Sequence, residues 1–186
     1  MVGLGNPGPR YERTRHNAGF LVIDELAARA RAASRHHPDA WIAEATLGGG
    51  PALLVKPLSS MNLSGEPVAR LLAEHAAAVS DLVVVVDDVA LPLGRIRARP
   101  HGSDGGHNGL RSLVAALGTE EYARVRVGVG LEDPPEMDLA DFVLADFLEE
   151  ELPRLREVTG LAADAVLCLL QQGAVAAMNR FNGRRV

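Results

Sequence analysis

Residues 3–19 read GLGNPGPRYERTRHNAG, and this stretch predicts the end of a strand, a shaped loop and the start of a helix near Ala18. Glycine permits backbone conformations that other residues avoid, and proline fixes φ, so Pro7 and Pro9 stiffen the loop. The loop also carries His16, two asparagines and three arginines. Such side chains suit the alignment of a polar substrate and the transfer of a proton better than the filling of a core. We therefore expect this loop to border the functional site.

Strands and helices alternate along the rest of the chain, as judged from apolar spacing and from Gly and Pro at the breaks. We expect helices over 18–32, from Ser64 onward with His75 on its apolar face, from the 102–109 loop to Gly118, and over 148–171 and 174–179. We expect strands over 41–47, 52–56, 82–86, 94–99 and 123–130. Residues 34–39 should form a linker and residues 131–138 a loop. No linker is long enough to divide the chain. The expected fold class is therefore α/β, a single domain over 1–186 with a mixed twisted sheet and helices packed around it.

The composition is ordinary for a soluble globular protein, with 186 residues, 47% of them hydrophobic and 23% charged. The single cysteine, Cys168, lies in an apolar run, which predicts a buried, inert thiol and fits a reducing compartment. The sequence shows neither a signal-peptide pattern nor a run of about 20 apolar residues that would span a membrane. We therefore expect a cytoplasmic protein without a membrane partner.

The charge is unevenly distributed. A net charge of −5 argues against nucleic-acid binding over the whole surface. Between Gly94 and Arg111, however, four arginines stand against a single acid, Asp104, and the acidic surplus lies in residues 132–151. Because salt screens charges beyond about 10 Å, a local basic patch on an acidic protein is enough to bind nucleic acid.

His16 and Asp87 are the candidate acid–base pair. The neighbours of His16 are polar, and Asp87 follows the apolar run 82–86, at the strand end where ligands gather in open α/β sheets. The plainer alternatives are a solvated histidine and a capping or strand-end carboxylate. A carboxylate beside a histidine fixes the tautomer of the ring and raises its basicity. Since no serine or cysteine has the setting of a nucleophile, water is the expected nucleophile.

Two further polar stretches precede predicted helices. In MNLSG (61–65), Asn62 either caps the helix or holds a carbonyl or amide of a substrate, and Met61 offers an adaptable apolar contact. In GSDGGHNGLR (102–111), small residues allow backbone amides to approach a ligand closely, and Asn108 has the same two alternatives as Asn62. Both stretches are therefore candidates for substrate binding.

Two cofactor hypotheses fail on their context. GLGNPG (3–8) has the glycine spacing of a dinucleotide-binding fingerprint, but prolines and a polar segment separate it from the helix whose amides would face the pyrophosphate. His101 and His107 suggest a metal, but no third ligand stands at a recognisable spacing. We therefore expect neither a nucleotide cofactor nor a metal.

Taken together, these stretches resemble the bacterial-type peptidyl-tRNA hydrolase family. The matching segments, in the family's order and over nearly the whole chain, are GLGNPG with Tyr11 and TRHNAG, KPLSSMNLSG, VVVVDDVALPLG, GRIRARPHGSDGGHNGLRSL, RVRVGVG, FVLADF and AMNRFN. The resemblance implies a mixed sheet with surrounding helices in an enzyme that is usually monomeric and uses no metal or cofactor. It also implies cleavage of the ester between a peptide and the terminal ribose of tRNA, which recycles tRNA from aborted translation.

The resemblance implies a role for each matching residue. His16 is the implied general base and Asp87 its orienting partner, and Asn6 completes the catalytic set. The residues implied to position the substrate or to line the peptide side of the cleft are Asn62, Asn108, Met61 and Tyr11. The positions implied to grip tRNA phosphate are Arg99 and Arg126, with Arg97 and Arg111 as further candidates.

The chain departs from the family pattern at four places, none of which touches the implied catalytic set. Ala90 stands where the family usually has an acid, and Ser60 stands where an aromatic is common. Residues 131–134 are acidic where the family tends to be basic, and several strand residues that are usual before VGLG are absent. The competing hypothesis is a non-catalytic RNA-binding protein on the same fold, because relatives that serve in splicing keep active-site residues. The absence of a transit peptide and of extra basic surface favours the hydrolase.

Overall fold

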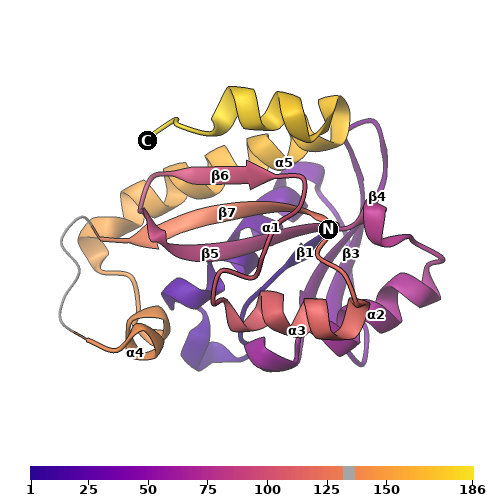
Figure 1. Cartoon of the computed structure of the whole chain (residues 1–186), viewed down its shortest axis with the longest axis horizontal. Helices are drawn as coiled ribbons and strands as arrows, with labels where there is room; N and C mark the ends of the chain where they lie inside the picture. The colour runs from indigo at the N-terminus through magenta and orange to yellow at the C-terminus, as the bar shows by residue number, and fades with distance from the viewer. Residues whose placement is uncertain (132–136) are drawn as a thin grey trace.

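A twisted sheet forms the centre of the molecule, with its strands in the order β2-β3-β4-β1-β5-β7-β6 (Figure 1). The computed structural model describes residues 1–131 and 137–186. Within these residues the strands are β1 (Val2–Gly3), β2 (Ser34–His36), β3 (Ala40–Leu47), β4 (Gly50–Pro57), β5 (Val83–Pro92), β6 (Ile96–Arg99) and β7 (Ala123–Gly130). β4, β1, β5 and β7 are parallel, whereas β3 and β6 run antiparallel to their neighbours. The expected fold class, a single α/β domain with a mixed sheet, is confirmed.

Helices cover both faces of this sheet. The described helices are α1 (Ala18–Ala30), α2 (Gly65–Glu74), α3 (Asn108–Leu117), α4 (Leu139–Leu144) and α5 (Leu152–Phe181). Side chains of α1 and α5 share one apolar cluster with one face of the sheet, and those of α2 and α3 share a second cluster with the other face. In Figure 1, α2 and α3 accordingly lie together on the side opposite α5.

β5 is buried because both of its faces are covered. Val84 and Val86 belong to the cluster under α2 and α3, whereas Val85 belongs to the cluster under α1 and α5. A strand between two helical layers needs apolar side chains on both sides, which explains the uninterrupted valine run. The strand continues past Asp87 to Pro92, so it is longer than the 82–86 run predicts.

Two glycines of the N-terminal stretch permit a close approach between β1 and α1. A Cβ atom on Gly3 would lie 2.3 Å from the backbone O of Gly19, and a Cβ on Gly19 would lie 2.5 Å from the backbone O atoms of Leu4 and Val85. Neither position tolerates a side chain without moving the backbone. Two short 3₁₀ turns, Pro9–Tyr11 and Arg15–Asn17, separate this loop from α1. The glycine spacing therefore serves packing, as the argument against a dinucleotide fingerprint expects.

Three features of the fold differ from the sequence-based expectations. The linker expected over 34–39 contains β2, a fully exposed edge strand whose residues show no apolar alternation. His75 is exposed at the end of α2, so its expected place on the apolar face is wrong. The short helix α4 is unexpected, since Phe142 is its single buried residue. The loop expected over 131–138 lies largely outside the described residues.

α5 combines the two helices expected near the C-terminus. The break falls at Gly173, whose φ of 84° lies in the left-handed region that favours glycine. By length and composition, Glu149–Phe181 is the described segment that could cross a membrane. Its apolar side chains, among them the buried free Cys168, instead join the cluster with α1 and the sheet. We therefore interpret α5 as a core helix.

Candidate active site

His16 and Asp87 meet beneath the surface, although 71 residues separate them in the chain. His16 lies in the 3₁₀ turn that precedes α1, and Asp87 lies in β5. The Nδ1 atom of His16 is 2.9 Å from Oδ1 of Asp87, and the two residues are 8% and 2% exposed. The structure therefore brings together the expected acid–base pair.

His107 contacts the same carboxylate oxygen from the other side. Its Nε2 is 2.9 Å from Oδ1 of Asp87, and its ring centroid lies 4.9 Å from that of His16. Its Nδ1 accepts hydrogen bonds from the backbone N–H groups of Gly109 and Leu110, so this histidine caps the N-terminus of α3. Since Nδ1 accepts, the ring hydrogen of a neutral His107 is on Nε2 and is donated to Asp87.

The role of His107 is not expected from the sequence, in which His107 is a candidate metal ligand and Asn108 is a candidate cap of the following helix. The structure makes His107 the cap and Asn108 the first residue of α3. The sequence signal for this capping role is a histidine that directly follows a glycine-rich loop and directly precedes a predicted helix. Its contact with Asp87 depends on where the helix sits, which no local pattern reveals.

Asp87 is held in its ionised form. Burial by itself would raise the pKa of this carboxyl, but the charge and hydrogen bond of His107, together with those of His16, outweigh burial and lower the pKa to about 2. A carboxylate can accept hydrogen bonds but cannot donate them, so Nδ1 of His16 carries a hydrogen toward Asp87. The Nε2 atom of a neutral His16 is then the basic nitrogen, and it can take a proton from water.

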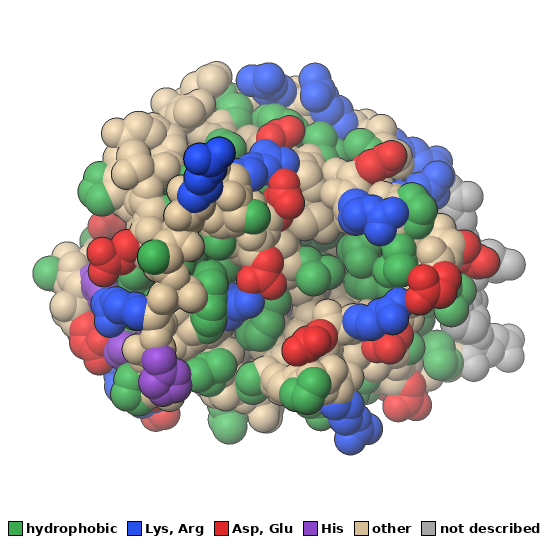
Figure 2. Space-filling view, turned by 180° about the vertical axis from the view of Figure 1, so that it is seen from behind, with side chains coloured by type: hydrophobic (Ala, Val, Ile, Leu, Met, Phe, Trp, Pro, Cys, Tyr) green, Lys and Arg blue, Asp and Glu red, His purple; other side chains and the backbone are tan. Residues whose placement is uncertain are grey.

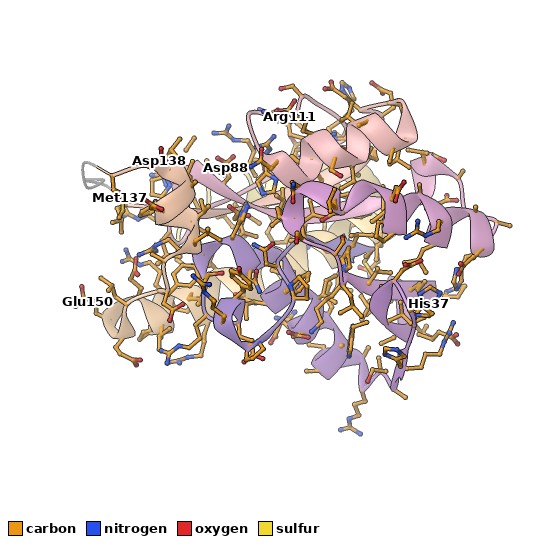
Figure 3. The ribbon with its side chains drawn as sticks, turned by 90° about the horizontal axis from the view of Figure 1, so that it is seen from below. His37, Asp88, Arg111, Met137, Asp138 and Glu150 are labelled. Carbon is orange, nitrogen blue, oxygen red and sulfur yellow. The ribbon has the colours of Figure 1, made fainter. Side chains whose placement is uncertain are left out.

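A cavity of about 200 Å³ opens beside this group. Its walls come from the His16 turn, β5, the glycine-rich loop, β7 and α4, and its lining residues are His16, Asp87, Asp88, Val89, Gly105, Gly106, His107, Asn108, Arg126, Leu139, Ala140 and Val143. In Figure 3, Asp88 lies between the start of α4, marked by Asp138, and the side of α3 that carries Arg111. Larger hollows of about 580 and 700 Å³ occur elsewhere, but neither is lined by a histidine that is hydrogen-bonded to a buried carboxylate. The cavity at His16 is therefore the candidate active site.

The same three side chains have the composition of a metal site, since the ligand atoms of His16, Asp87 and His107 lie within 4.8 Å of one another. The hydrogen bonds oppose that use. A metal bound at Nε2 of His107 would displace the hydrogen that this atom donates to Asp87, while Nδ1 is already committed to the amides of α3. The donor set therefore suits a proton-transfer site better than a metal site.

Asn6 is fixed by two neighbours. Its backbone N–H donates to Oδ1 of Asn17 at 2.8 Å, and Nδ2 of Asn17 donates to the backbone O of Asn6 at 3.0 Å. Its own Oδ1 accepts the backbone N–H of Met61 at 2.8 Å. These contacts orient the Asn6 amide. Among the described residues its Nδ2 has no hydrogen-bond partner, so both of its hydrogens are available to a ligand. Asn17 is not among the site residues expected from the sequence.

The other expected substrate-binding residues are placed differently from one another. Asn108 lines the cavity, whereas Asn62 is exposed in the 3₁₀ turn Met61–Leu63 and Tyr11 is half-buried; neither lines the cavity. Met61 is 4% exposed. Its sulfur packs so closely on Gly109 that a Cβ there would lie 2.6 Å from Sδ. Met61 therefore holds α3 in place and presents little surface to a ligand.

Arg126 differs from the other arginines expected to bind phosphate. Its guanidinium group donates to the backbone O of Ser103 at 2.9 Å and of Asp104 at 3.2 Å, and it lies 3.5 Å from the carboxylate of Asp88. The side chain is 14% exposed. It therefore braces the glycine-rich loop that leads to His107. Of the four arginines expected to bind phosphate, the three exposed ones are Arg97, Arg99 and Arg111.

A mixed α/β sheet that holds a carboxylate between two histidines beside a cavity has the parts that a hydrolase site needs, and the family comparisons place the chain in that class. The family model described as peptidyl-tRNA hydrolase matches residues 1–186. The chain is 48% identical to the peptidyl-tRNA hydrolase of Frankia casuarinae, over 98% of this chain and 92% of that one. It is 47% identical to that of Thermotoga petrophila, over 100% and 98% of the two chains.

Solved structures agree with these matches. A crystal structure of peptidyl-tRNA hydrolase from Acinetobacter baumannii superposes with a TM-score of 0.87 at 31% identity, covering 99% of this chain and 94% of that one. A complex of peptidyl-tRNA hydrolase with N-propanol gives a TM-score of 0.90 at 30% identity with the same coverage. The chain belongs to the peptidyl-tRNA hydrolase family.

Proposed function

We propose that this protein is a peptidyl-tRNA hydrolase in which His16 is the general base that activates water. The reaction is hydrolysis of the ester between a peptide and the terminal ribose of tRNA, which returns tRNA to translation. The observation that supports this most directly is the hydrogen bond from His16 to the buried, ionised Asp87 beside a solvent cavity, in a chain of this family.

The chemistry needs one water and one base. Nε2 of His16 takes a proton from the water while its oxygen bonds to the ester carbonyl carbon, which forms a tetrahedral intermediate. The bond between that carbon and the ribose oxygen then breaks, and the imidazolium returns the proton to the ribose oxygen. Asp87 holds the ring in the required tautomer and stabilises the imidazolium. An ester needs no covalent enzyme intermediate, since its alkoxide leaves more readily than an amine.

Amide side chains supply the polar contacts in this proposal. Nδ2 of Asn6, oriented by Asn17 and Met61, donates to the developing oxyanion or holds the water. Asn108 at the cavity wall holds the ribose end or the peptide main chain. Asn62 and Tyr11 lie outside the cavity lining, where they would contact the peptide further from the ester. His107 acts as a positioning residue for Asp87.

The tRNA is held by phosphate contacts that carry no sequence information, as an enzyme that serves all tRNAs requires. Arg97, Arg99 and Arg111 are the exposed candidates, and Arg126 acts on the shape of the glycine-rich loop instead. The proposal includes a monomeric enzyme in the cytoplasm, where a reducing environment suits the single buried Cys168. Sedimentation of the purified protein with and without tRNA measures the oligomeric state.

The direct test is release of N-acetylated amino acid from N-acetyl-aminoacyl-tRNA in the presence of a chelator. Replacement His16→Ala is expected to lower kcat by about 10²–10⁴, the usual contribution of a general base. His36→Ala, at an exposed histidine in β2, is the matched control and should keep the wild-type rate. Wild-type protein that binds tRNA without releasing product would instead support the RNA-binding hypothesis.

A further inference from the structure

Arg124, in β7, is a buried arginine that the proposed mechanism does not use. The residue is 1% exposed, and among residues 1–131 and 137–186 no carboxylate forms an ion pair with it. Figure 2 shows the usual situation in the middle of the rear face of the molecule, where Lys and Arg side chains lie beside Asp and Glu side chains. Burial lowers the pKa of Arg124, but a guanidinium keeps its charge in a protein. Because a charge buried without a counter-charge lowers stability, the hydrogen bonds of this group need an explanation.

The two hydrogen-bonded nitrogens of this guanidinium join the two ends of α3. Nη1 of Arg124 donates to the backbone O of Ser103 at 3.1 Å, in the glycine-rich loop before α3. Nη2 donates to the backbone O of Glu120 at 2.9 Å, in the segment that leads from α3 into β7. Arg124 therefore fastens both segments that flank α3 to one point on the sheet.

The ring of Tyr122 holds the guanidinium in place. The Cζ atom of Arg124 lies 4.4 Å from the ring centroid of Tyr122, which is itself 1% exposed. Tyr122 belongs to the same apolar cluster as Leu110 and Leu113 of α3. A guanidinium stacked on a ring keeps its N–H groups for hydrogen bonds in its own plane. Arg124 is thus anchored beside the core under α3 and bonded to the loop.

The glycine-rich loop connects this anchor to His107. Ser103 is followed by a turn in which the backbone O of Asp104 accepts the backbone N–H of His107 at 3.1 Å. The ring of His107 then reaches Oδ1 of Asp87 at 2.9 Å. One loop turn and one side chain therefore lie between the Arg124 guanidinium and the carboxylate that orients the base.

We infer that Arg124 is a positioning residue for the reaction, because its hydrogen bonds place the glycine-rich loop so that His107 meets Asp87. This inference rests on the proposed function, in which Asp87 orients the general base. A misplacement of about 1 Å that starts far from the reacting atoms can lower a rate by about 10²-fold. Loss of the Arg124 contacts should therefore slow the chemical step without weakening substrate binding.

Arg124 duplicates neither a phosphate-binding arginine nor Arg126. A phosphate of the tRNA cannot reach a guanidinium that is 1% exposed and whose Nη atoms both donate to carbonyl oxygens. Arg126 donates to the same oxygen of Ser103 at 2.9 Å. Its remaining contacts are Asp104 of the loop and Asp88 of the cavity wall. Of these two arginines, Arg124 is the one that ties the loop to the segment after α3.

The test compares the steady-state kinetics of Arg124→Met, Arg124→Lys and Arg29→Met on N-acetyl-aminoacyl-tRNA. Methionine offers no donor, so kcat should fall about three- to tenfold with KM unchanged. Lysine keeps the charge and can donate to one of the two carbonyl oxygens, so it should restore part of kcat, and it carries the test if Arg124→Met does not fold. The control, Arg29→Met, removes a guanidinium that donates to the backbone O of Gly160, outside the cavity lining, and should match wild type.

A double variant separates positioning from a general loss of structure. If Arg124 acts through His107, the kcat of Arg124→Met/His107→Asn should equal that of His107→Asn alone. Independent structural effects would instead multiply, and that outcome would overturn the inference. A wild-type kcat in Arg124→Met would overturn it as well.

NMR spectra of the histidine ring nitrogens test the same contact without turnover. The hydrogen bonds of His107 fix the tautomer that carries its hydrogen on Nε2. In Arg124→Met this tautomer should no longer be fixed, so the shifts of the two ring nitrogens should move toward each other, whereas Arg29→Met should keep them apart. Unchanged His107 signals in Arg124→Met would overturn the inference. Wild-type protein that releases no product would contradict the proposed function, and the spectra would still decide whether Arg124 positions His107.

Discussion

At the scale of single residues, the site depends on two histidines that share one carboxylate oxygen but have different duties. Nδ1 of His16 donates to Asp87, and its Nε2 is the basic nitrogen, whereas both nitrogens of His107 are used within the protein. Because the pKa of Asp87 is lowered to about 2, its carboxylate is negatively charged at neutral pH. The carboxylate therefore orients one ring for chemistry and is itself oriented by the other.

The two contacts of His107 can be separated by substitution. His107→Asn keeps a good helix cap but is too short to reach Asp87, whereas His107→Ala loses both contacts. We expect both variants to lower kcat by about tenfold or more, since a hydrogen bond to a charged group contributes about 1.5–3 kcal/mol. Only His107→Ala should also lose about 1 kcal/mol of unfolding free energy, the value of a cap.

Urea unfolding and steady-state kinetics on the same preparations measure these two effects. Asn108→Ala, next to the cap but without its contacts, shows what an ordinary change at this helix end does to stability. If His107→Asn kept the wild-type kcat, His107 would be a helix cap alone and its contact with Asp87 would have no part in catalysis.

The residue scale also shows what sequence can and cannot predict about the site. His16 and Asp87 stand out because they are polar residues next to apolar or rigid segments, and the resemblance to the family implies their pairing. The cap at His107 and the brace from Asn17 to Asn6 depend on the placement of α3 and of the Met61 turn. Arg126 has the same local pattern as exposed arginines on strands, yet the glycine-rich loop folds over it.

At the scale of elements, Arg15 joins the His16 turn to α4 through the ring of Phe142 and, through a buried ion pair, to Glu151 just before α5. Nη1 and Nη2 of Arg15 donate to the two carboxylate oxygens of Glu151, at 2.9 and 2.7 Å. The group also lies 4.7 Å from the ring centroid of Phe142 in α4 and 4.9 Å from that of Phe147. Since α4 supplies Leu139, Ala140 and Val143 to the cavity, Arg15 holds one cavity wall against the loop that carries the base.

Replacement of Arg15 should therefore affect both stability and substrate binding. Arg15→Ala leaves Glu151 buried without its partner, which is expected to cost about 3–5 kcal/mol of unfolding free energy. Arg15→Lys keeps the charge but loses the two-pronged contact and the stacking, so its loss should be smaller. In Arg15→Lys, a loosened α4 should raise KM more than it lowers kcat.

The control is Arg29→Ala, which removes partly exposed ion pairs with Glu25 and Asp164 and should cost about 1 kcal/mol or less. The double variant Arg15→Met/Glu151→Leu removes both buried charges and should recover most of the stability lost in Arg15→Ala. Equal instability of the double variant and of Arg15→Ala would contradict the buried-charge explanation.

The elements themselves were predicted with uneven success for physical reasons. β5, β7 and α3 have long apolar patterns and clear breaks, so sequence alone places them well. β2 and α4 are short and bury almost nothing, so they form because a neighbouring element offers hydrogen bonds or a docking surface. Such elements leave little trace in local sequence.

At the scale of the whole molecule, this acidic protein has its charge segregated along the chain. The sequence predicts the basic segment between Gly94 and Arg111, because those residues are contiguous. It does not predict that the C-terminal tail returns to β6, since that depends on the direction of α5. Which residues lie beside β6 is thus a property of the fold.

Replacement of Arg99 and of Arg126, which carry the same charge, should therefore change the kinetics in different ways. Arg99 is exposed on β6, so Arg99→Gln should raise KM for the tRNA substrate and flatten the salt dependence by about one, with kcat unchanged. Arg126 is bonded to the backbone of Ser103 and Asp104 in the loop before His107, so Arg126→Gln should lower kcat and leave the salt slope as in wild type. Kinetics at several salt concentrations distinguish the two. A flattened slope in Arg126→Gln would mean that this arginine reaches a phosphate in the complex, and the bracing role would then be wrong.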